Sequence, residues 1–166
     1  EIASCLVGSE MCIRDSRRID LRDLVESFVT ARQATTETHE LGFVAGDKEV
    51  PVMVQDGRIV QILDNLLGNA VSFAPADTSI EFAVSLADDG SACLEVCDQG
   101  PGIPEGRLNE VFNRFYSERP EGEAFGEHSG LGLSIAQQIA QGYGGDLVAS
   151  NRDGACLTLT LPRTAI

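Results

Sequence analysis

Two asparagines stand four residues apart in an otherwise apolar stretch, where they could contact a charged ligand. Asn65 and Asn69 fall in ILDNLLGNA, and this spacing puts both side chains on one face of a helix. Amides on a mostly buried face are costly unless something bonds them. An amide oxygen suits a hard cation such as Mg²⁺, which also accepts phosphate oxygens as ligands. Alternatively, both amides cap neighbouring backbone groups.

A carboxylate followed by glycines forms a second candidate site. Asp98 begins DQGPGI directly after an alternating apolar run and shares the inward parity of Leu94 and Val96. We expect this carboxylate at the rim of the core, where it could accept a hydrogen bond from an amino group such as that of adenine. Gly100 and Gly102 permit positive φ and close approach of a ligand ring. A plain turn after an edge strand is the alternative interpretation.

A third glycine-rich segment opens a helix. Ser129, Gly130, Leu131, Gly132 and Leu133 lead into an apolar stretch, and free N–H groups at a helix start favour anions. The segment is no Walker loop, because no lysine follows the glycines, and no Rossmann fingerprint, because no strand precedes it. Residues 118–128, between the second and third sites, are long and polar, which favours a mobile lid over a nucleotide.

Apolar spacing predicts the elements that must position these residues. Helices are expected after a short strand at 19–21, with Asp20 or Asp23 as the cap, then from 55–57 to Pro75, and from 131 to 141. Residues 43–54 hold two short apolar runs, and strands are expected as a hairpin of 80–86 with 94–98 and as a closing pair at 146–150 and 156–161. This order predicts an α+β two-layer sandwich, with helices on one face of a mixed, mostly antiparallel sheet.

Composition excludes several classes of protein. The chain has 166 residues and a formal net charge of −14, so binding of nucleic acid through a broad basic face is not expected. No apolar run approaches the roughly 20 residues of a membrane span. Of the five cysteines, Cys93 and Cys97 should face the same way in a strand, and no CxxC pair occurs. With only two histidines a zinc site is disfavoured, and reduced thiols are expected.

Taken in order, these motifs resemble the ATPase superfamily of gyrase, heat-shock chaperones, histidine kinases and MutL (GHKL). ILDNLLGNA resembles its asparagine box, DQGPGI and SGLGLSIA its two glycine boxes, and EVFNRFY the phenylalanine box of histidine kinases. GACLTLTLP resembles the closing strand, so the resemblance covers residues 19–163. Within histidine kinases, NAVSFAP and FGEHSGLGLSIAQQIA are most similar to the ChvG type of alphaproteobacteria. The resemblance implies the Bergerat fold with a mobile ATP lid.

The resemblance also implies roles for individual residues. Asn69 would ligate Mg²⁺, Asn65 and Arg114 would act near the γ-phosphate of ATP, and Asp98 would bind adenine. Phe112 and Phe115 would anchor the lid, although simple core packing is an alternative for both. The remaining nucleotide contacts would come from Ser72, Phe73, Gly100, Gly102, Ile103, Ser129, Gly130, Leu131, Gly132 and Leu133.

Three positions depart from the family pattern. Ser72 replaces a common phosphate-binding lysine, His128 a common glycine, and Ala155 a common threonine or serine. His39-Glu40-Leu41 resembles a phosphoacceptor box only superficially, because the arginine and proline that follow in that motif are absent. The resemblance therefore implies the catalytic half of a kinase, without its acceptor histidine.

The implied activity is transfer of the γ-phosphate to a histidine on a separate helical-hairpin domain of a homodimeric parent kinase, which passes it to a response regulator. We expect a cytoplasmic domain whose parent is anchored in the inner membrane. Alternatives are a serine kinase or ATPase of the same superfamily, or a non-catalytic nucleotide-binding module. Residues 1–16 resemble translated sequencing-adapter sequence, so the native domain is expected at 17–166.

Overall fold

The computed structural model describes residues 15–113 and 132–164. Most of the adapter-like segment, up to residue 14, and the whole expected lid at 118–128 lie outside the described residues. Among the described residues no helix is both long enough and apolar enough to cross a bilayer.

The described part is built on a five-stranded sheet in the order β2-β4-β5-β7-β6. Its strands are β2 (Glu40–Ala45), β4 (Ser79–Leu86), β5 (Ala92–Cys97), β6 (Asp146–Asn151) and β7 (Ala155–Leu161). Only β2 and β4 pair in parallel, and the other three pairs are antiparallel. The mixed, mostly antiparallel sheet is therefore confirmed, as is the hairpin of β4 and β5.

A second, two-stranded sheet lies apart from the first. It pairs β1 (Arg17–Asp20) with β3 (Pro51–Val54) in antiparallel fashion. The two apolar runs within 43–54 both contribute to strands, of which β2 joins the large sheet and β3 the small one.

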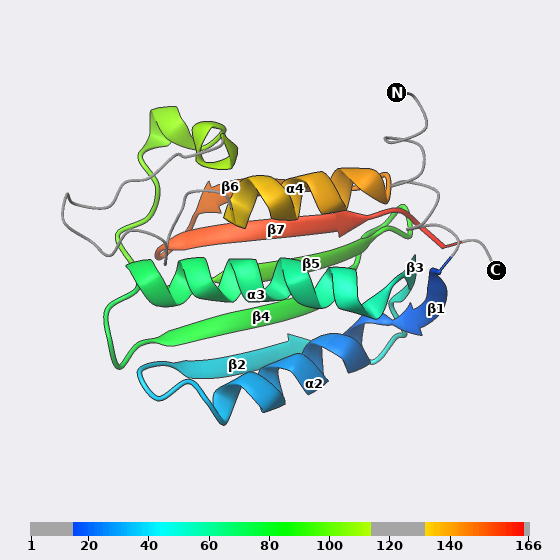
Figure 1. Ribbon diagram of the computed structural model, residues 1–166, viewed down its shortest axis with the longest axis horizontal. Coiled ribbons are helices and arrows are strands. Elements are labelled where there is room, and N and C mark those ends of the chain that lie inside the picture. Colours follow the sequence, from blue (N-terminus) through cyan, green and yellow to red (C-terminus); the bar gives the residue numbers. More distant parts are fainter. Residues whose placement is uncertain (1–14, 114–131, 165–166) are drawn as a thin grey trace.

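Helices α2 (Leu21–Gln33), α3 (Asp56–Phe73) and α4 (Gly132–Gly142) cover one face of the large sheet, with α3 in the middle (Figure 1). Two short 3₁₀ turns, η1 (Glu105–Arg107) and η2 (Glu110–Phe112), follow β5. The helices bury their apolar faces against inward strand residues. The fully buried side chains include Leu21, Val25, Ile59, Ile62, Leu63, Leu66, Ile80, Phe82, Leu94, Leu147 and Leu159. The predicted two-layer sandwich is confirmed, and α3 is the helix that carries both asparagines.

The first of these helices shows which of two candidate caps operates. Asp20 is the N-cap of α2 and accepts a hydrogen bond from the Arg22 N–H at 3.1 Å. It also accepts from Val50 N–H at 3.1 Å and from the Arg22 guanidinium at 2.7 Å. The hydrogen bond from the Arg22 side chain is the main cause that lowers the pKa of Asp20. Asp20, and not Asp23, therefore joins the helix start to the chain before β3.

The expectation of reduced thiols is wrong for two cysteines. Cys97 and Cys156 form a disulfide, with their Cα atoms 4.2 Å apart. They are direct partners in the antiparallel register of β5 and β7, and this spacing is close to the ~4.5 Å of a non-hydrogen-bonded pair. Cys93 is a free thiol. The two cysteines lie 59 positions apart in the sequence, and only the strand pairing brings them together.

Candidate functional site

The start of α4 lies against the asparagine face of α3. Asn65 and Asn69 are both half-buried. A Cβ added to Gly132 would lie 3.7 Å from Asn65 Cγ, which is ordinary van der Waals contact. The first residue of α4 therefore faces Asn65, and the N–H groups of a helix's first turn have no partner within the helix itself. This arrangement brings Asn65 and the first residue of α4 together.

The side-chain amides of Asn65 and Asn69 stabilise no other part of the described structure through hydrogen bonds. Neither side chain forms a hydrogen bond to another described residue, so the interpretation that they cap nearby backbone is not supported there. Both side chains remain partly accessible. The two amide oxygens are thus available as ligands for a cation or as partners of phosphate-bound water.

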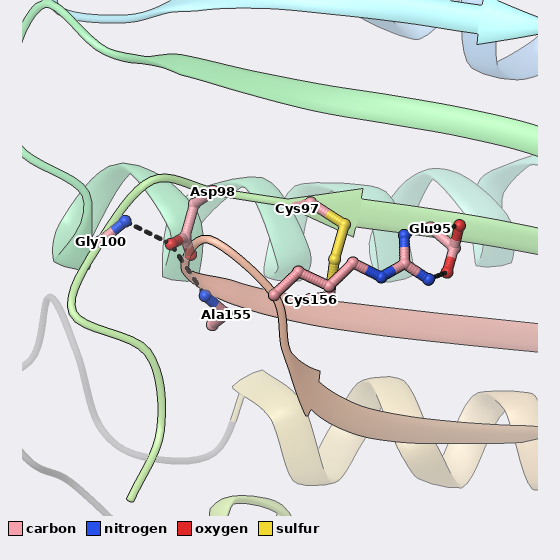
Figure 2. Close-up of a disulfide and its surroundings, with 7 residues drawn as sticks. Glu95, Cys97, Asp98, Gly100, Ala155 and Cys156 are labelled. Carbon is pink, nitrogen blue, oxygen red and sulfur yellow. Dashed lines mark hydrogen bonds and ion pairs between the residues drawn. A yellow bond between two sulfur atoms is a disulfide. The ribbon is translucent and has the colours of Figure 1, made fainter.

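Asp98 lies at the end of β5, where its carboxylate is held by backbone donors (Figure 2). Its side chain is only 6% exposed, as the inward parity predicted. Oδ1 accepts hydrogen bonds from the N–H groups of Gly100 at 2.8 Å and Ala155 at 3.2 Å. Within the described residues, no hydrogen bond ends at Oδ2, so this oxygen can accept one from a ligand.

Burial raises the pKa of Asp98 above its ordinary value of 3.8. The two backbone hydrogen bonds and the nearby His39 lower it again, but less than burial raises it. A carboxylate held at this cost, with one oxygen unused, is more typical of a binding site than of a plain turn.

Glycines allow the chain to close around Asp98. A Cβ on Gly154 would lie 2.3 Å from the Asp98 carbonyl oxygen and 2.8 Å from the Gly100 nitrogen. A Cβ on Gly100 would lie 3.0 Å from the Phe73 carbonyl oxygen. The carboxyl end of α3 therefore abuts the turn after Asp98. Since Asn65 and Phe73 are eight residues apart, about 12 Å along a helix axis, an elongated ligand beside α3 could reach both ends of the site.

Asn151, which the sequence analysis did not single out, fixes the loop after Asp98. Its Oδ1 accepts from the Ile103 N–H at 2.8 Å, and its Nδ2 donates to the Ile103 carbonyl at 2.6 Å. This pair of bonds holds Gly102 at a φ of +80°, a conformation that favours glycine. Gly154 was likewise missed as a site residue. Both act through contacts between distant segments, for which neither residue carries a local signal.

The remaining predicted residues divide into two groups. Phe112 is buried in the core, and Ile103 and Leu133 are partly buried against it. Ser72 and Phe73 are half-buried in the last turn of α3. The other predicted residues lie outside the described residues: Arg114, Phe115, Ser129, Gly130 and Leu131.

His39 is a structural residue. Its side chain is 6% exposed, Nε2 donates to the Ala74 carbonyl at 3.1 Å, and Nδ1 lies 2.8 Å from Thr38 Oγ1. The imidazole thus ties the start of β2 to the end of α3. With both ring nitrogens engaged inside the fold, it does not resemble a phosphoacceptor, in agreement with the sequence analysis.

The sequence matches known proteins over most of its length. Residues 55–165 match the family model of the histidine kinase-, DNA gyrase B-, and HSP90-like ATPases. The chain is 38% identical over 172 residues to the sensor protein ChvG of Rhizobium meliloti (strain 1021), covering 94% of this chain and 30% of that protein. The chain thus spans less than a third of that curated relative.

Solved structures share the fold. The mycobacterial sensor histidine kinase MprB superposes with a TM-score of 0.75 at 24% identity, covering 90% of this chain and 99% of that one. The ATP binding domain of PrrB from Mycobacterium tuberculosis gives a TM-score of 0.73 at 24% identity, covering 91% and 99%. With residues 55–165 matched by the family model, the chain belongs to the histidine kinase-, DNA gyrase B-, and HSP90-like ATPases, and it is similar over most of its length to part of a sensor protein of that family.

Proposed function

We propose that residues 17–166 bind ATP with Mg²⁺ and donate the γ-phosphate to a histidine on a separate helical-hairpin domain of a homodimeric parent kinase. That kinase, cytoplasmic in this part and anchored in the inner membrane, would pass the phosphate to a response regulator. The observation that carries the proposal is that α3 bears two amides with no hydrogen-bond partner among the described residues, and that it ends against the turn of the buried Asp98, whose Oδ2 accepts no hydrogen bond from those residues.

Each part of the site has a chemical task in this proposal. Oδ2 of Asp98 accepts a hydrogen bond from the exocyclic amine of adenine, while Oδ1 stays on Gly100 and Ala155. Gly100, Gly102 and Ile103 let the ring approach the backbone. At the other end, the start of α4 offers N–H groups to the phosphates. These groups bind and orient the nucleotide, which is the main requirement of phosphoryl transfer.

Asn69 fits a magnesium ligand because its half-buried amide is unpartnered within the described residues. Clusters of three or more His, Cys, Asp or Glu are also absent from the described part, so a protein-only metal cage is not the alternative there. One amide oxygen with phosphate oxygens and waters is a typical Mg²⁺ shell. The cation would neutralise phosphate charge, and Asn65, next to Gly132, would contact the γ-phosphate side.

Residues outside the described part complete the proposal. Arg114 would place its charge near the γ-phosphate. Phe115, with Phe112, would anchor the lid, and Ser129, Gly130 and Leu131 would extend the phosphate cradle before Gly132. Position 65 is an asparagine, where hydrolysis of the MutL type requires an acidic residue, so we favour transfer over hydrolysis.

The direct test is a titration with a fluorescent ATP analogue, with and without Mg²⁺. For Asn69→Ala we expect the gain in affinity caused by Mg²⁺ to vanish, because the variant removes the only amide oxygen assigned to the ion. Gln61→Ala, at an exposed position of the same helix, is the control and should keep that gain. Unchanged Mg²⁺-dependent affinity in Asn69→Ala would contradict the assignment, and no binding by the unmodified chain would contradict the proposed function.

A further inference from the structure

The disulfide joins the two residues that are next in sequence to Asp98 and to its hydrogen-bond partner Ala155. Cys97 precedes Asp98 at the end of β5, and Cys156 follows Ala155 at the start of β7 (Figure 2). The Asp98 N–H donates to the Ala155 carbonyl at 3.0 Å, and the Ala155 N–H donates to Asp98 Oδ1 at 3.2 Å. The cross-link is therefore one residue away, on both strands, from the pair that holds the carboxylate.

The two sulfur atoms differ in access. Cys156 is fully buried, whereas Cys97 is half-buried on the face of β5 that turns away from the core. Glu95 lies on that same face and pairs with Arg152, beside the tight turn in which Arg152 N–H donates to the Gly154 carbonyl. Reagents in solution can thus reach Cys97 more readily than Cys156.

The free thiol of Cys93 gives an internal comparison. It lies four residues before Cys97 and points to the same face, but it has no disulfide partner. Burial, and secondarily the charge of Glu95, raises the pKa of the Cys93 thiol, which makes it a weak nucleophile. Cys93 can therefore serve as a matched control that shares the strand but faces Ser85 and Thr160, not a cysteine, on the neighbouring strands.

We propose that Cys97 and Cys156 are a reversible oxidation site that couples thiol redox state to nucleotide affinity. The inference rests on the proposed function, which places the site where ATP is found; disulfides in such compartments are usually transient and redox-sensing. Strand ends open more easily than strand centres, and Asp98 with Ala155 is the last pair before the chain leaves both strands. The disulfide prevents this opening, whereas the reduced pair relies on hydrogen bonds alone.

The chemical step is thiol–disulfide exchange with a small-molecule disulfide such as oxidised glutathione. The Cys97 thiolate attacks one sulfur, forms a mixed disulfide and releases one small thiolate. The Cys156 thiolate then attacks Cys97 Sγ, forms the Cys97–Cys156 bond and releases the second. The two protons lost by the protein thiols are taken up by the two released thiolates. Two protein thiols are oxidised and one small disulfide is reduced.

The size of the effect follows from the fraction of molecules with a closed site. If the reduced pair keeps Asp98 and Ala155 together about one third of the time, apparent affinity falls about threefold, because apparent affinity scales with that fraction. The disulfide form should therefore bind the nucleotide more tightly than the reduced form.

The test uses the full chain equilibrated in glutathione buffers of graded redox ratio. Alkylation with mass spectrometry measures the disulfide, and titration with the fluorescent ATP analogue and Mg²⁺ measures affinity. We expect about threefold tighter binding in the disulfide form. Cys97→Ser and Cys156→Ser should bind like the reduced chain in every buffer, while Cys93→Ser should keep the redox response. The comparison of the two forms of the unmodified chain does not depend on any variant folding.

Three results would overturn the inference: no Cys97–Cys156 bond in oxidising buffer, equal affinity of the two forms, or tighter binding by the reduced form. Each of these leaves ATP binding itself intact. Absence of nucleotide binding in both forms would instead overturn the proposed function, and the redox inference with it, so the two failures are distinguishable.

Discussion

Asp98 is a carboxylate in a buried position, where the loss of solvation disfavours its charged form. The side chain is 6% exposed, and burial is the main cause that raises its pKa. An asparagine has nearly the same shape, and its amide oxygen could accept from the same two backbone N–H groups. The difference between the two residues lies in the second atom, which accepts a hydrogen bond in aspartate and donates one in asparagine.

For this reason Asp98→Asn should reduce the affinity for ATP by about tenfold to 150-fold, the equivalent of about 1.5–3 kcal/mol for one hydrogen bond to a charged group. The titration described above measures this loss. An ATP analogue without the exocyclic amine provides the control: it should bind the unmodified chain weakly and should lose little more in the variant. If Asp98→Asn reduced the affinity for that analogue as much as it reduces the affinity for ATP, Asp98 would not contact the amine.

The same variant, Asp98→Asn, should lose affinity for ATP but gain thermal stability. A folded-state pKa above the ordinary 3.8 means that the contribution of Asp98 to stability is fully present below that value and is lost as pH rises through the folded-state pKa. Asp98→Asn should therefore raise the melting temperature near neutral pH, and the gain should shrink toward acid. Calorimetry of both proteins between about pH 4 and pH 8 checks this. A gain that grows toward acid would contradict the assigned pKa direction.

At the scale of elements, the turn between β6 and β7 closes the site. Gly154 has no space for a side chain, because a Cβ would lie 2.3 Å from the Asp98 carbonyl oxygen. That oxygen belongs to backbone and cannot rotate away. The turn and the loop after β5 are thus packed directly against each other, and Asn151 adds its two hydrogen bonds to Ile103.

Gly154→Ala should destabilise the domain by about 1–3 kcal/mol, the usual cost of forcing a methyl group into a packed site. It should also weaken nucleotide binding, because the displaced segment carries Asp98. Gly106→Ala is the matched control, since a Cβ there has no heavy atom within 4 Å. Chemical denaturation and the same titration measure both effects. Equal stability of the two variants would show that the turn adjusts freely.

The sequence predicts most elements but few of their contacts. The helical spacing of Ile59, Ile62, Leu63 and Leu66 predicts α3, and alternation predicts β4 and β5, because these are local patterns. The assignment of β3 to a separate sheet, the Cys97–Cys156 bond and the roles of Asn151 and Gly154 depend on pairing between distant segments. The position of Asp98 was predicted because strand parity is local, whereas its N–H partner on Ala155 comes from another strand 57 positions away.

At the scale of the whole molecule, the disulfide should also act on global stability. It joins residues separated by 59 positions, so it restricts the unfolded chain by about 4 kcal/mol in the chain-entropy model. Reduction should lower the free energy of unfolding by up to this amount. Denaturation with and without reductant measures the loss, and Cys93→Ser should show the same loss. A stability that reductant leaves unchanged would mean that the bond is absent or is offset by native-state strain.

The small sheet of β1 and β3 has a practical consequence. Thr164 Oγ1 donates to the Pro51 carbonyl at 3.1 Å, so the end of the described chain is fixed to this sheet. The small sheet lies at the opposite end of α3 from the loop that follows β5 (Figure 1). A dye or a sensor-chip tether attached beyond Thr164 should therefore lie far from the proposed nucleotide site, so surface-based measurements of nucleotide association and dissociation should not be obstructed by it.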